Sequence, residues 1–513
     1  MTCMVFSRDA VRRLSAATQY SFYMIGIALL SSCGDVAFSS TSQDSVVSGQ
    51  DDREPLNVLF ILTDDQAWDT VAALGNRQIS TPTIDSLVDQ GMTFTHVFNQ
   101  GAWSGAVCLP SRQMINTGRH LYRTGLDARG VNDKQFVQQY PVFGETFLKN
   151  GYNTFQTGKW HLSMDVWKRS FNHGTAIHKN GMSRHEDGGQ WAADFTDYDA
   201  SVADDAAFKD YKGDKHSSEV IADAAVSFIN QQAAADRPFM MYVAFLAPHD
   251  PRQAPQQYLD KYPPESIELP DNYLPYHPFD QGDYYLRDEV LVGFPRSSKV
   301  VKENIAEYYA MIEHMDAQIA RILDALEQSD KADNTLIVFT SDHGLAVGKH
   351  GLMGKQNQYD HSVRVPFVIA GPNIPTDTSA PGMFYLNSVF PTAAELAGIE
   401  TPKSVDAPSI GPLIRGEKKI VYDTVYGAYR HFQRMLRSQN FKLIYYPMIG
   451  KTQLFDLRSD PLELNDLAAM PEQAERIAEM MAQLAQWQEV VEDPLDFNAP
   501  EESYQDFLKL TWD

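Results

Sequence analysis

The chain has 513 residues, which predicts a large core with a smaller appendage or a second domain. Hydrophobic residues make up 43% and charged residues 21%, which argues against disorder, a coiled coil or a collagen-like chain. The formal net charge of −24 argues against nucleic-acid binding, because the whole molecule repels polyanions. An anionic substrate would therefore need a local cluster of cationic side chains.

Residues 1–33 have the pattern of an export signal. Three arginines precede an apolar run at 22–30, which is long enough for a signal-peptide core and too short for a permanent membrane span. The run ends in Leu30-Ser31-Ser32-Cys33-Gly34, which resembles a bacterial lipobox. We therefore expect an exported lipoprotein, periplasmic or at the cell surface, that contacts the membrane only through lipid on Cys33. The alternative is a secreted or soluble periplasmic protein cleaved near Ala37.

The three cysteines have different expected fates. Cys3 would be lost with the signal, Cys33 would carry the lipid, and residues 34–55, rich in Ser, Asp and Gly, predict a flexible tether. Cys108 is left without a partner. An unpaired cysteine in an exported protein has no disulfide role. Taken alone, it is best explained as a small buried apolar residue, so its neighbours decide its function.

Short apolar runs alternate with helical patterns over most of the chain. The patterns predict strands at 57–62, 152–156, 239–246, 335–340 and 365–370, and helices at 83–90, 142–149, 217–232, 300–328 and 388–398. This alternation predicts an α/β fold with a mostly parallel central sheet sandwiched by helices.

The pattern changes beyond about residue 420. Short strands are predicted at 425–429, 434–437, 441–446 and 453–457, followed by a helix at 473–490. We therefore predict a catalytic domain over 56–420 and a smaller antiparallel α+β subdomain over 421–513. The Pro-rich, acidic stretch at 248–296 predicts a long loop insertion, a common location for residues that shape a substrate site.

Polar residues follow the predicted strands. They are Asp64 and Asp65 after the first strand, Lys159 and His161 after the second, His249 after the third, and Asp342 and His343 after the fourth. Ligands in open α/β sheets bind beyond the carboxyl ends of the strands, so we expect these side chains to meet at one edge. The three-aspartate set favours Ca²⁺ or Mg²⁺ over zinc. On its own, the Asp64-Asp65 pair is equally compatible with a turn or helix cap.

Five short motifs occur in a characteristic order. The first, Cys108-Leu109-Pro110-Ser111-Arg112, matches the sulfatase modification motif Cys-x-Pro-Ser-Arg. The others are Gly158-Lys159-Trp160-His161, Pro248-His249-Asp250-Pro251, Ser341-Asp342-His343-Gly344 and Gly354-Lys355-Gln356-Asn357. From about 57 to 467 the chain thus resembles the type I sulfatases of the alkaline-phosphatase-like superfamily.

That resemblance implies a nucleophile and a cofactor. A separate maturation enzyme would oxidise Cys108 to formylglycine, and a hydroxyl of its hydrated aldehyde would attack the sulfur atom of a sulfate ester. One Ca²⁺ ion would be bound by Asp64, Asp65, Asp342, His343 and the modified Cys108. The family often has Asn where His343 stands, and histidine is a known variant at this position.

The resemblance also implies roles for the remaining motif residues. Arg112 would hold the diol oxygen, Ser111 would support the turn, and Lys159 and Lys355 would bind sulfate oxygens. His161 would act as the base that collapses the sulfated intermediate, and His249 as the acid that protonates the leaving alcohol. Taken singly, each lysine or histidine is more often a solvated or structural residue.

Substrate recognition is less determined. Arg252, Arg430, His431 and Arg434 are candidates, since arginines can bind a uronic acid carboxylate or a second sulfate; surface ion pairs are the alternative. We expect an exo-acting sulfatase on oligosaccharides from sulfated polysaccharide. The alternatives are a phosphodiesterase or phosphonate monoester hydrolase of the same superfamily, and an inert glycan-binding lipoprotein if Cys108 is unmodified.

Overall fold

The structure is a computed structural model that describes residues 54–124, 140–282 and 285–503. These described residues belong to one compact unit. The export signal, the lipobox and nearly all of the tether lie outside the described residues, so their assignment remains a prediction. Within the three described ranges, no helix is long and apolar enough to cross a membrane.

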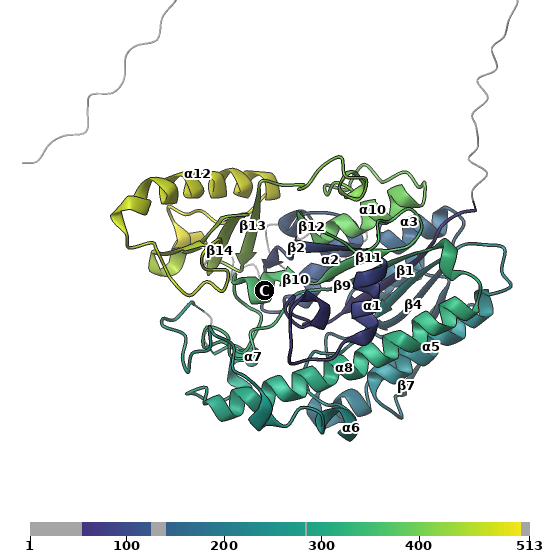
Figure 1. Cartoon of the computed structure of the whole chain (residues 1–513). Helices are drawn as coiled ribbons and strands as arrows, with labels where there is room; N and C mark the ends of the chain where they lie inside the picture. The colour runs from purple at the N-terminus through teal and green to yellow at the C-terminus, as the bar shows by residue number, and fades with distance from the viewer. Residues whose placement is uncertain (1–53, 125–139, 283–284, 504–513) are drawn as a thin grey trace, which may run out of the picture. The chain divides into compact units, whose positions relative to one another are not determined.

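An 11-stranded sheet organises the larger part of this unit (Figure 1). Its parallel centre consists of β9 (Thr335–Ser341), β1 (Asn57–Thr63), β8 (Phe239–Ala244), β4 (Asn153–Lys159) and β5 (His173–His178), in that order. Antiparallel pairing adds β11 (Phe367–Ala370), β2 (Met92–Phe98) and β10 (Arg364–Val365) at one side and β6 (Asp194–Tyr198) and β7 (Phe208–Lys212) at the other. Strand β12 (Thr378–Tyr385) pairs in parallel with β2. The predicted mostly parallel centre is confirmed.

Helices cover both faces of this sheet. Successive residues of a central strand point to opposite faces, and here the residues on both faces are apolar. Val58, Phe60 and Leu62 of β1 belong to one core cluster, and Leu59 and Ile61 belong to the other. The first cluster includes residues of α2 (Cys108–Thr117), α3 (Phe143–Lys149), α4 (Met164–Ser170) and α10 (Val389–Leu396). The second includes residues of α1 (Pro82–Gln90), α5 (Ser217–Gln232) and α8 (Ser298–Gln328).

A five-stranded sheet forms the C-terminal part. It contains the antiparallel strands β13 (Thr424–Tyr429), β14 (Gln433–Ser438), β15 (Phe441–Tyr446) and β16 (Lys451–Asp456), with α12 (Ala474–Val491) beside it (Figure 1). The predicted α+β character is confirmed, while a boundary at 420 remains a prediction. The fifth strand, β3 (Gly101–Ala102), comes from just before Cys108 and pairs with β13. The small sheet is thereby joined to the segment that carries the predicted nucleophile.

The sequence did not predict several elements. Strands β5, β6 and β7 are short and polar, and all ten residues of α2 are buried, so these segments lack the periodicity of a half-buried element. The single strand expected at 365–370 is divided at Pro366, which has no N–H to donate. Shorter helices are α6 (Gln256–Leu259), α7 (Arg287–Val290), α9 (Asp360–Val363) and α11 (Gly411–Ile414). The insertion at 248–296 therefore contains the short helices α6 and α7 and a 3-10 turn at Pro264–Ser266.

Candidate active site

The predicted catalytic residues gather at the carboxyl ends of the central strands. Asp64 and Asp65 follow β1, and Lys159 is the last residue of β4. His249 follows β8, and Asp342 comes directly after β9, as the sequence predicted. Two backbone hydrogen bonds tie neighbouring turns together: the Asp64 N–H donates to the Ala247 carbonyl (3.2 Å) and the Asp342 N–H to the Thr63 carbonyl (3.1 Å). All five of these residues are buried, with exposures of 5% or less.

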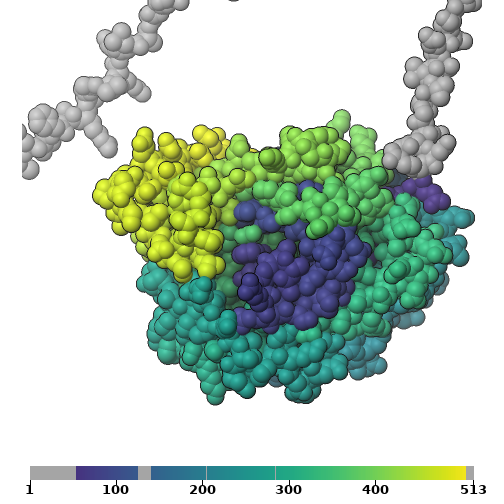
Figure 2. Space-filling view, viewed as in Figure 1, coloured from purple at the N-terminus to yellow at the C-terminus, as the bar shows by residue number. Residues whose placement is uncertain are grey.

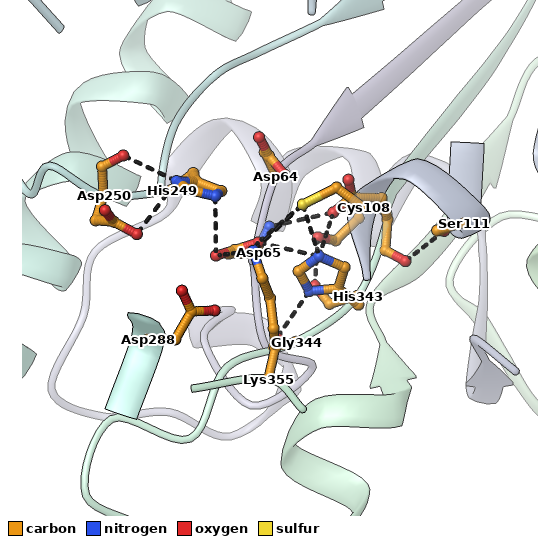
Figure 3. A network of polar contacts seen from close by, with 12 residues as sticks. Asp64, Asp65, Cys108, Ser111, His249, Asp250, Asp288, His343, Gly344 and Lys355 are labelled. Atoms are coloured by element: carbon orange, nitrogen blue, oxygen red, sulfur yellow. Dashed lines mark hydrogen bonds and ion pairs between the residues drawn. The ribbon is translucent and has the colours of Figure 1, made fainter. Parts of the chain in front are cut away.

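Helix α2 brings Cys108 to this edge. The Ser111 hydroxyl donates to the Asp342 carbonyl (2.7 Å), and Arg112 donates from Nε to Asp342 Oδ2 (3.1 Å) and from Nη1 to the Lys159 carbonyl (2.7 Å). These bonds fix the start of α2 over the strand ends. The Cys108 Sγ atom then lies 3.3 Å from His343 Nε2 and 3.2 Å from Lys355 Nζ (Figure 3).

The side chains around Cys108 fit a divalent cation. One ligand atom each from Asp64, Cys108, Asp342 and His343 lie within 4.8 Å of one another, and Asp65, Cys108 and His249 form a second such group. Among the described residues, the buried Asp64 Oδ1 has no hydrogen-bond donor, as expected of an oxygen reserved for a metal.

His343 is oriented to contribute a nitrogen ligand. Its Nδ1 lies 2.9 Å from the Gly344 carbonyl, which accepts a hydrogen bond from it and leaves Nε2 facing Asp65 Oδ1 (3.1 Å). Burial alone would lower the pKa of His343, but the neighbouring carboxylates of Asp342 and Asp65 have the larger effect and raise this pKa to about 9. A proton on Nε2 and a bound cation are alternative ways to neutralise these carboxylates. The residues at this position therefore suit the predicted Ca²⁺ site.

A positive cluster surrounds the position of the nucleophile. Lys159 Nζ pairs with Asp64 Oδ2, and Lys355 Nζ donates to both oxygens of Asp65 (2.8 and 3.0 Å). Burial raises the pKa of the Cys108 thiol, but Lys159 and Lys355 lower it more, to about 6. An anion at this position is therefore stabilised, which is what an oxygen nucleophile or a bound sulfate requires.

Two histidines, His161 and His249, line the same cavity as Cys108. His249 Nε2 is 3.9 Å from Asp65 Oδ2, while its Nδ1 is 2.8 Å from the Asp250 carbonyl. Both His161 (φ 60°) and Asp65 (φ 71°) have left-handed backbone conformations, which cost energy in residues other than glycine and often occur at functional sites. Gly181 lies against His161: a Cβ atom there would be 2.7 Å from His161 Nε2.

These residues open into a cavity of about 380 Å³. Four predicted catalytic residues line it: Cys108, His161, His249 and Lys355. Its other walls are formed by Gly105, Ala106, Gly181, Met182, Leu286, Arg287, Asp288, Gln356 and Arg430. Of these residues, only Arg430 was assigned a role from the sequence. The insertion at 248–296 was a signal for Leu286, Arg287 and Asp288, and Gln356 lies within the last motif.

A larger cavity, of about 450 Å³, lies between residues 68–78, 268–272 and 461–463. Figure 2 shows a hollow where stretches of these colours, purple, teal and yellow, meet. None of the predicted catalytic residues lines this cavity. We therefore assign the chemistry to the smaller cavity, because it contains the nucleophile position.

The predicted substrate-binding residues are dispersed. Arg430 lines the catalytic cavity, whereas Arg252, His431 and Arg434 are not among its walls. Arg434 is 1% exposed and donates from Nε and Nη2 to Asp493 (2.6 and 2.7 Å), so its charge is already neutralised inside the C-terminal part. Arg252 donates to Asn304 Oδ1 (2.6 Å). These residues lie close in sequence to the cavity residues His249 and Arg430, but their side chains do not line the cavity.

Comparisons with known proteins agree with this geometry. The sulfatase family model matches residues 56–399, and the model of the C-terminal region of N-sulphoglucosamine sulphohydrolase matches residues 348–490. The first match covers more than half of the chain, so the protein belongs to the sulfatase family and is a hydrolase of sulfuric esters.

Individual relatives are similar over most of their length. The chain is 25% identical to an N-acetylglucosamine-6-O-sulfatase of Bacteroides thetaiotaomicron, over 87% of this chain and 88% of the relative. It is 27% identical to an ulvan-active sulfatase of Formosa agariphila, over 91% and 86%. A solved structure of a protein in complex with its substrate D-glucosamine-2-N,6-O-disulfate has a TM-score of 0.71 and 23% identity, covering 86% of this chain and 99% of that one. This last similarity supports the fold.

Proposed function

We propose that the protein removes an O-sulfate group from a sulfated carbohydrate, with formylglycine derived from Cys108 as the nucleophile. One observation carries the proposal: Cys108 lies at the wall of a cavity, between Lys355 Nζ at 3.2 Å and His343 Nε2 at 3.3 Å, beside three buried carboxylates. When formed, formylglycine supplies a hydrated aldehyde that attacks sulfur with one hydroxyl and releases sulfate through the other.

The surrounding residues can bind the sulfate group and stabilise charge. Asp64, Asp65, Asp342 and His343 would hold Ca²⁺, which supplies Lewis-acid polarisation of a sulfate oxygen. Lys355 would contact both the nucleophile and a sulfate oxygen, a role supported by its Nζ atom, which bridges Asp65 and Cys108. Arg112 is fixed by Asp342 and can hold an oxygen atom at position 108.

The two histidines of the cavity, His161 and His249, would provide the acid and base groups of the reaction. With Nδ1 held by the Asp250 carbonyl, His249 can carry a proton on Nε2 and donate it to the leaving alcohol. His161 lines the same cavity as Cys108 and would accept a proton from the group at position 108.

A carbohydrate substrate is favoured by the names of the relatives and by the size of the cavity. A volume of about 380 Å³ is at the small end of ligand sites, which supports binding of a terminal sugar and therefore exo action. Export through the signal at 1–33 and anchoring through Cys33 belong to the same proposal, because sulfated polysaccharides are met outside the cell. Incorporation of labelled palmitate into wild type, but not into Cys33→Ala, would support the anchor.

The function is tested with protein that has been coexpressed with a maturation enzyme. Mass spectrometry of the peptide containing Cys108 should show an aldehyde in place of the thiol. The same preparation should hydrolyse 4-nitrophenyl sulfate or members of a panel of O-sulfated sugars much faster than bis(4-nitrophenyl) phosphate, and lose activity after chelation. A strong preference for the phosphodiester would favour the alternative hydrolase, and full activity with an intact thiol would refute the nucleophile.

A further inference from the structure

The turn that carries Lys355 is held by an acidic residue of the 248–296 insertion. Glu289, on α7, is 2% exposed and accepts hydrogen bonds from the Gly354 N–H (2.8 Å) and the Met353 N–H (3.0 Å). Its second partner is the fully buried Arg296, whose Nη2 is 2.6 Å from Glu289 Oε2. The backbone N–H groups of the two residues before Lys355 are therefore held by one side chain.

The other end of α7 reaches the turn that carries His249. Arg287 donates from Nη1 and Nη2 to the two carboxylate oxygens of Asp250 (2.7 and 2.9 Å). Asp250 Oδ1 is 3.3 Å from His249 Nδ1, and the Asp250 carbonyl is 2.8 Å from the same nitrogen. A bidentate guanidinium–carboxylate pair thus fixes Asp250. Asp250 in turn orients the His249 imidazole, as Figure 3 shows.

Asp288 completes the contact between the two turns. Its carboxylate accepts from Gln356 Nε2 (2.6 Å) and pairs with Arg287 Nη2 (2.7 Å). The packing is tight, since a Cβ atom on Gly354 would lie 2.8 Å from the Cβ atom of Asp288. The two residues that follow Glu289 in the chain, Val290 and Leu291, are 52% and 47% exposed. The inward contacts of α7 are therefore mainly polar and directed to the two catalytic turns, and α7 contributes little to the apolar core.

We propose that α7 is a positioning element for both turns: Glu289 places Lys355, and Arg287, acting through Asp250, places His249. Neither Arg287 nor Glu289 belongs to the motifs on which the family resemblance depends. The proposal rests on the proposed function, in which Lys355 contacts sulfate and His249 protonates the leaving group. The two roles predict different kinetic signatures.

The role of Arg287 is tested with two leaving groups. 4-Nitrophenolate departs without a proton, whereas phenolate benefits from a general acid. Arg287→Ala should therefore lower kcat/KM for phenyl sulfate by ~10–100-fold and leave 4-nitrophenyl sulfate nearly unchanged. Arg287→Lys should restore part of the loss because it keeps the charge but not the bidentate geometry. The matched control is Arg321→Ala, since Arg321 is 44% exposed against 40% for Arg287 and pairs with Asp223, and neither Arg321 nor Asp223 lines the cavity that contains Cys108.

The role of Glu289 is tested with Glu289→Gln. Loss of Lys355 placement should lower kcat/KM for both aryl sulfates by a similar ~10–100-fold and weaken the binding of inorganic sulfate measured by calorimetry. Glu313→Gln is the control: Glu313 is another buried glutamate, 7% exposed, that pairs with Lys261 on the outer part of the insertion. It should alter thermal stability without changing sulfate binding. Arg296→Lys replaces Glu289→Gln if that variant does not fold.

The outcomes separate this proposal from the proposed function. If the wild-type protein hydrolyses no sulfate ester, the proposed function is wrong. The affinity of Glu289→Gln for inorganic sulfate still tests the role of Glu289 in that case. Active wild type with equal losses for both leaving groups in Arg287→Ala, or with unchanged sulfate affinity in Glu289→Gln, overturns the positioning roles. A loss of activity that matches the two control variants would likewise reduce α7 to a structural element.

Discussion

At the residue scale, catalysis depends on a few side chains whose surroundings change their chemistry. Cys108 is the clearest case, because two lysines and a histidine favour an anion at a buried position where burial alone would disfavour one. Cys108→Ala should abolish hydrolysis of sulfate esters while leaving the melting temperature within a few degrees of wild type. Removing one small buried sulfur atom creates little empty space in a large scaffold. Activity near the wild-type level in this variant would exclude position 108 as the nucleophile.

Gly181 gives a second prediction at this scale. A methyl group there would lie 2.7 Å from His161 Nε2, so the imidazole would have to move. Because the ring end of a side chain can shift at low cost, Gly181→Ala should change stability by less than ~1 kcal/mol but lower kcat/KM by ~10-fold or more. Gly293→Ala is the control, since its added Cβ would meet nothing within 4 Å. Equal activity of the two variants would argue against a catalytic His161.

At the scale of elements, one helix caps another. Asp316 of α8 accepts the N–H groups of Thr83 (3.0 Å) and Ile84 (2.8 Å) at the start of α1, where the side chain of Thr81 makes no cap. Asp316→Ala should lower the free energy of unfolding by about 1–2 kcal/mol, because two buried donors lose their acceptor. Urea unfolding monitored by circular dichroism measures this loss.

The effect of Asp316 should depend on pH. Burial raises the pKa of Asp316 to about 6, so its ionised form is less favourable in the folded than in the unfolded chain. The advantage of wild type over Asp316→Ala should be largest below about pH 4 and should shrink as pH rises through about 6. Unfolding at pH 5 and pH 8 checks the sign, and a difference that grows with pH would contradict it.

At the scale of the whole molecule, a buried ion cluster joins the two sheets. Asp360 of α9 accepts from Arg437 Nε on β14 (3.1 Å) and from Lys442 Nζ on β15 (2.8 Å), and Glu463 Oε1 accepts from the same lysine (2.6 Å). Together with the pairing of β3 and β13, this cluster attaches the C-terminal sheet to the segment leading to Cys108. The C-terminal part thus supports the catalytic cavity as well as contributing Arg430 to its wall.

Asp360→Asn should destabilise the protein by about 3–5 kcal/mol, because two buried cations would lose a carboxylate in a region that water does not reach. Denaturant unfolding gives the magnitude. Asp205→Asn serves as control, since Asp205 is 93% exposed where it pairs with Lys168, and we expect no measurable change there. If the two variants are equally stable, the cluster does not hold the sheets together.

The sequence by itself determined the features that depend on local pattern. The strands at 57–62, 239–246 and 335–340 were evident because buried parallel strands require continuous apolar residues, and the topology of such a sheet brings their carboxyl ends together. The cluster of Asp64, Asp65 and Asp342 around Cys108 followed from that rule and from the motif order.

Only the tertiary structure decided which distant side chains complete the site. Helix α2 was missed because it is buried on all sides, and Arg434 was assigned to substrate although it pairs with Asp493, 59 residues away. The role of α7 is equally invisible in the sequence, because Glu289 meets Gly354 across 65 residues of chain. The local sequence pattern of an element indicates which of its faces is buried. The contacts described here form between segments that are far apart in the sequence, and no short-range periodicity indicates which distant segments will meet.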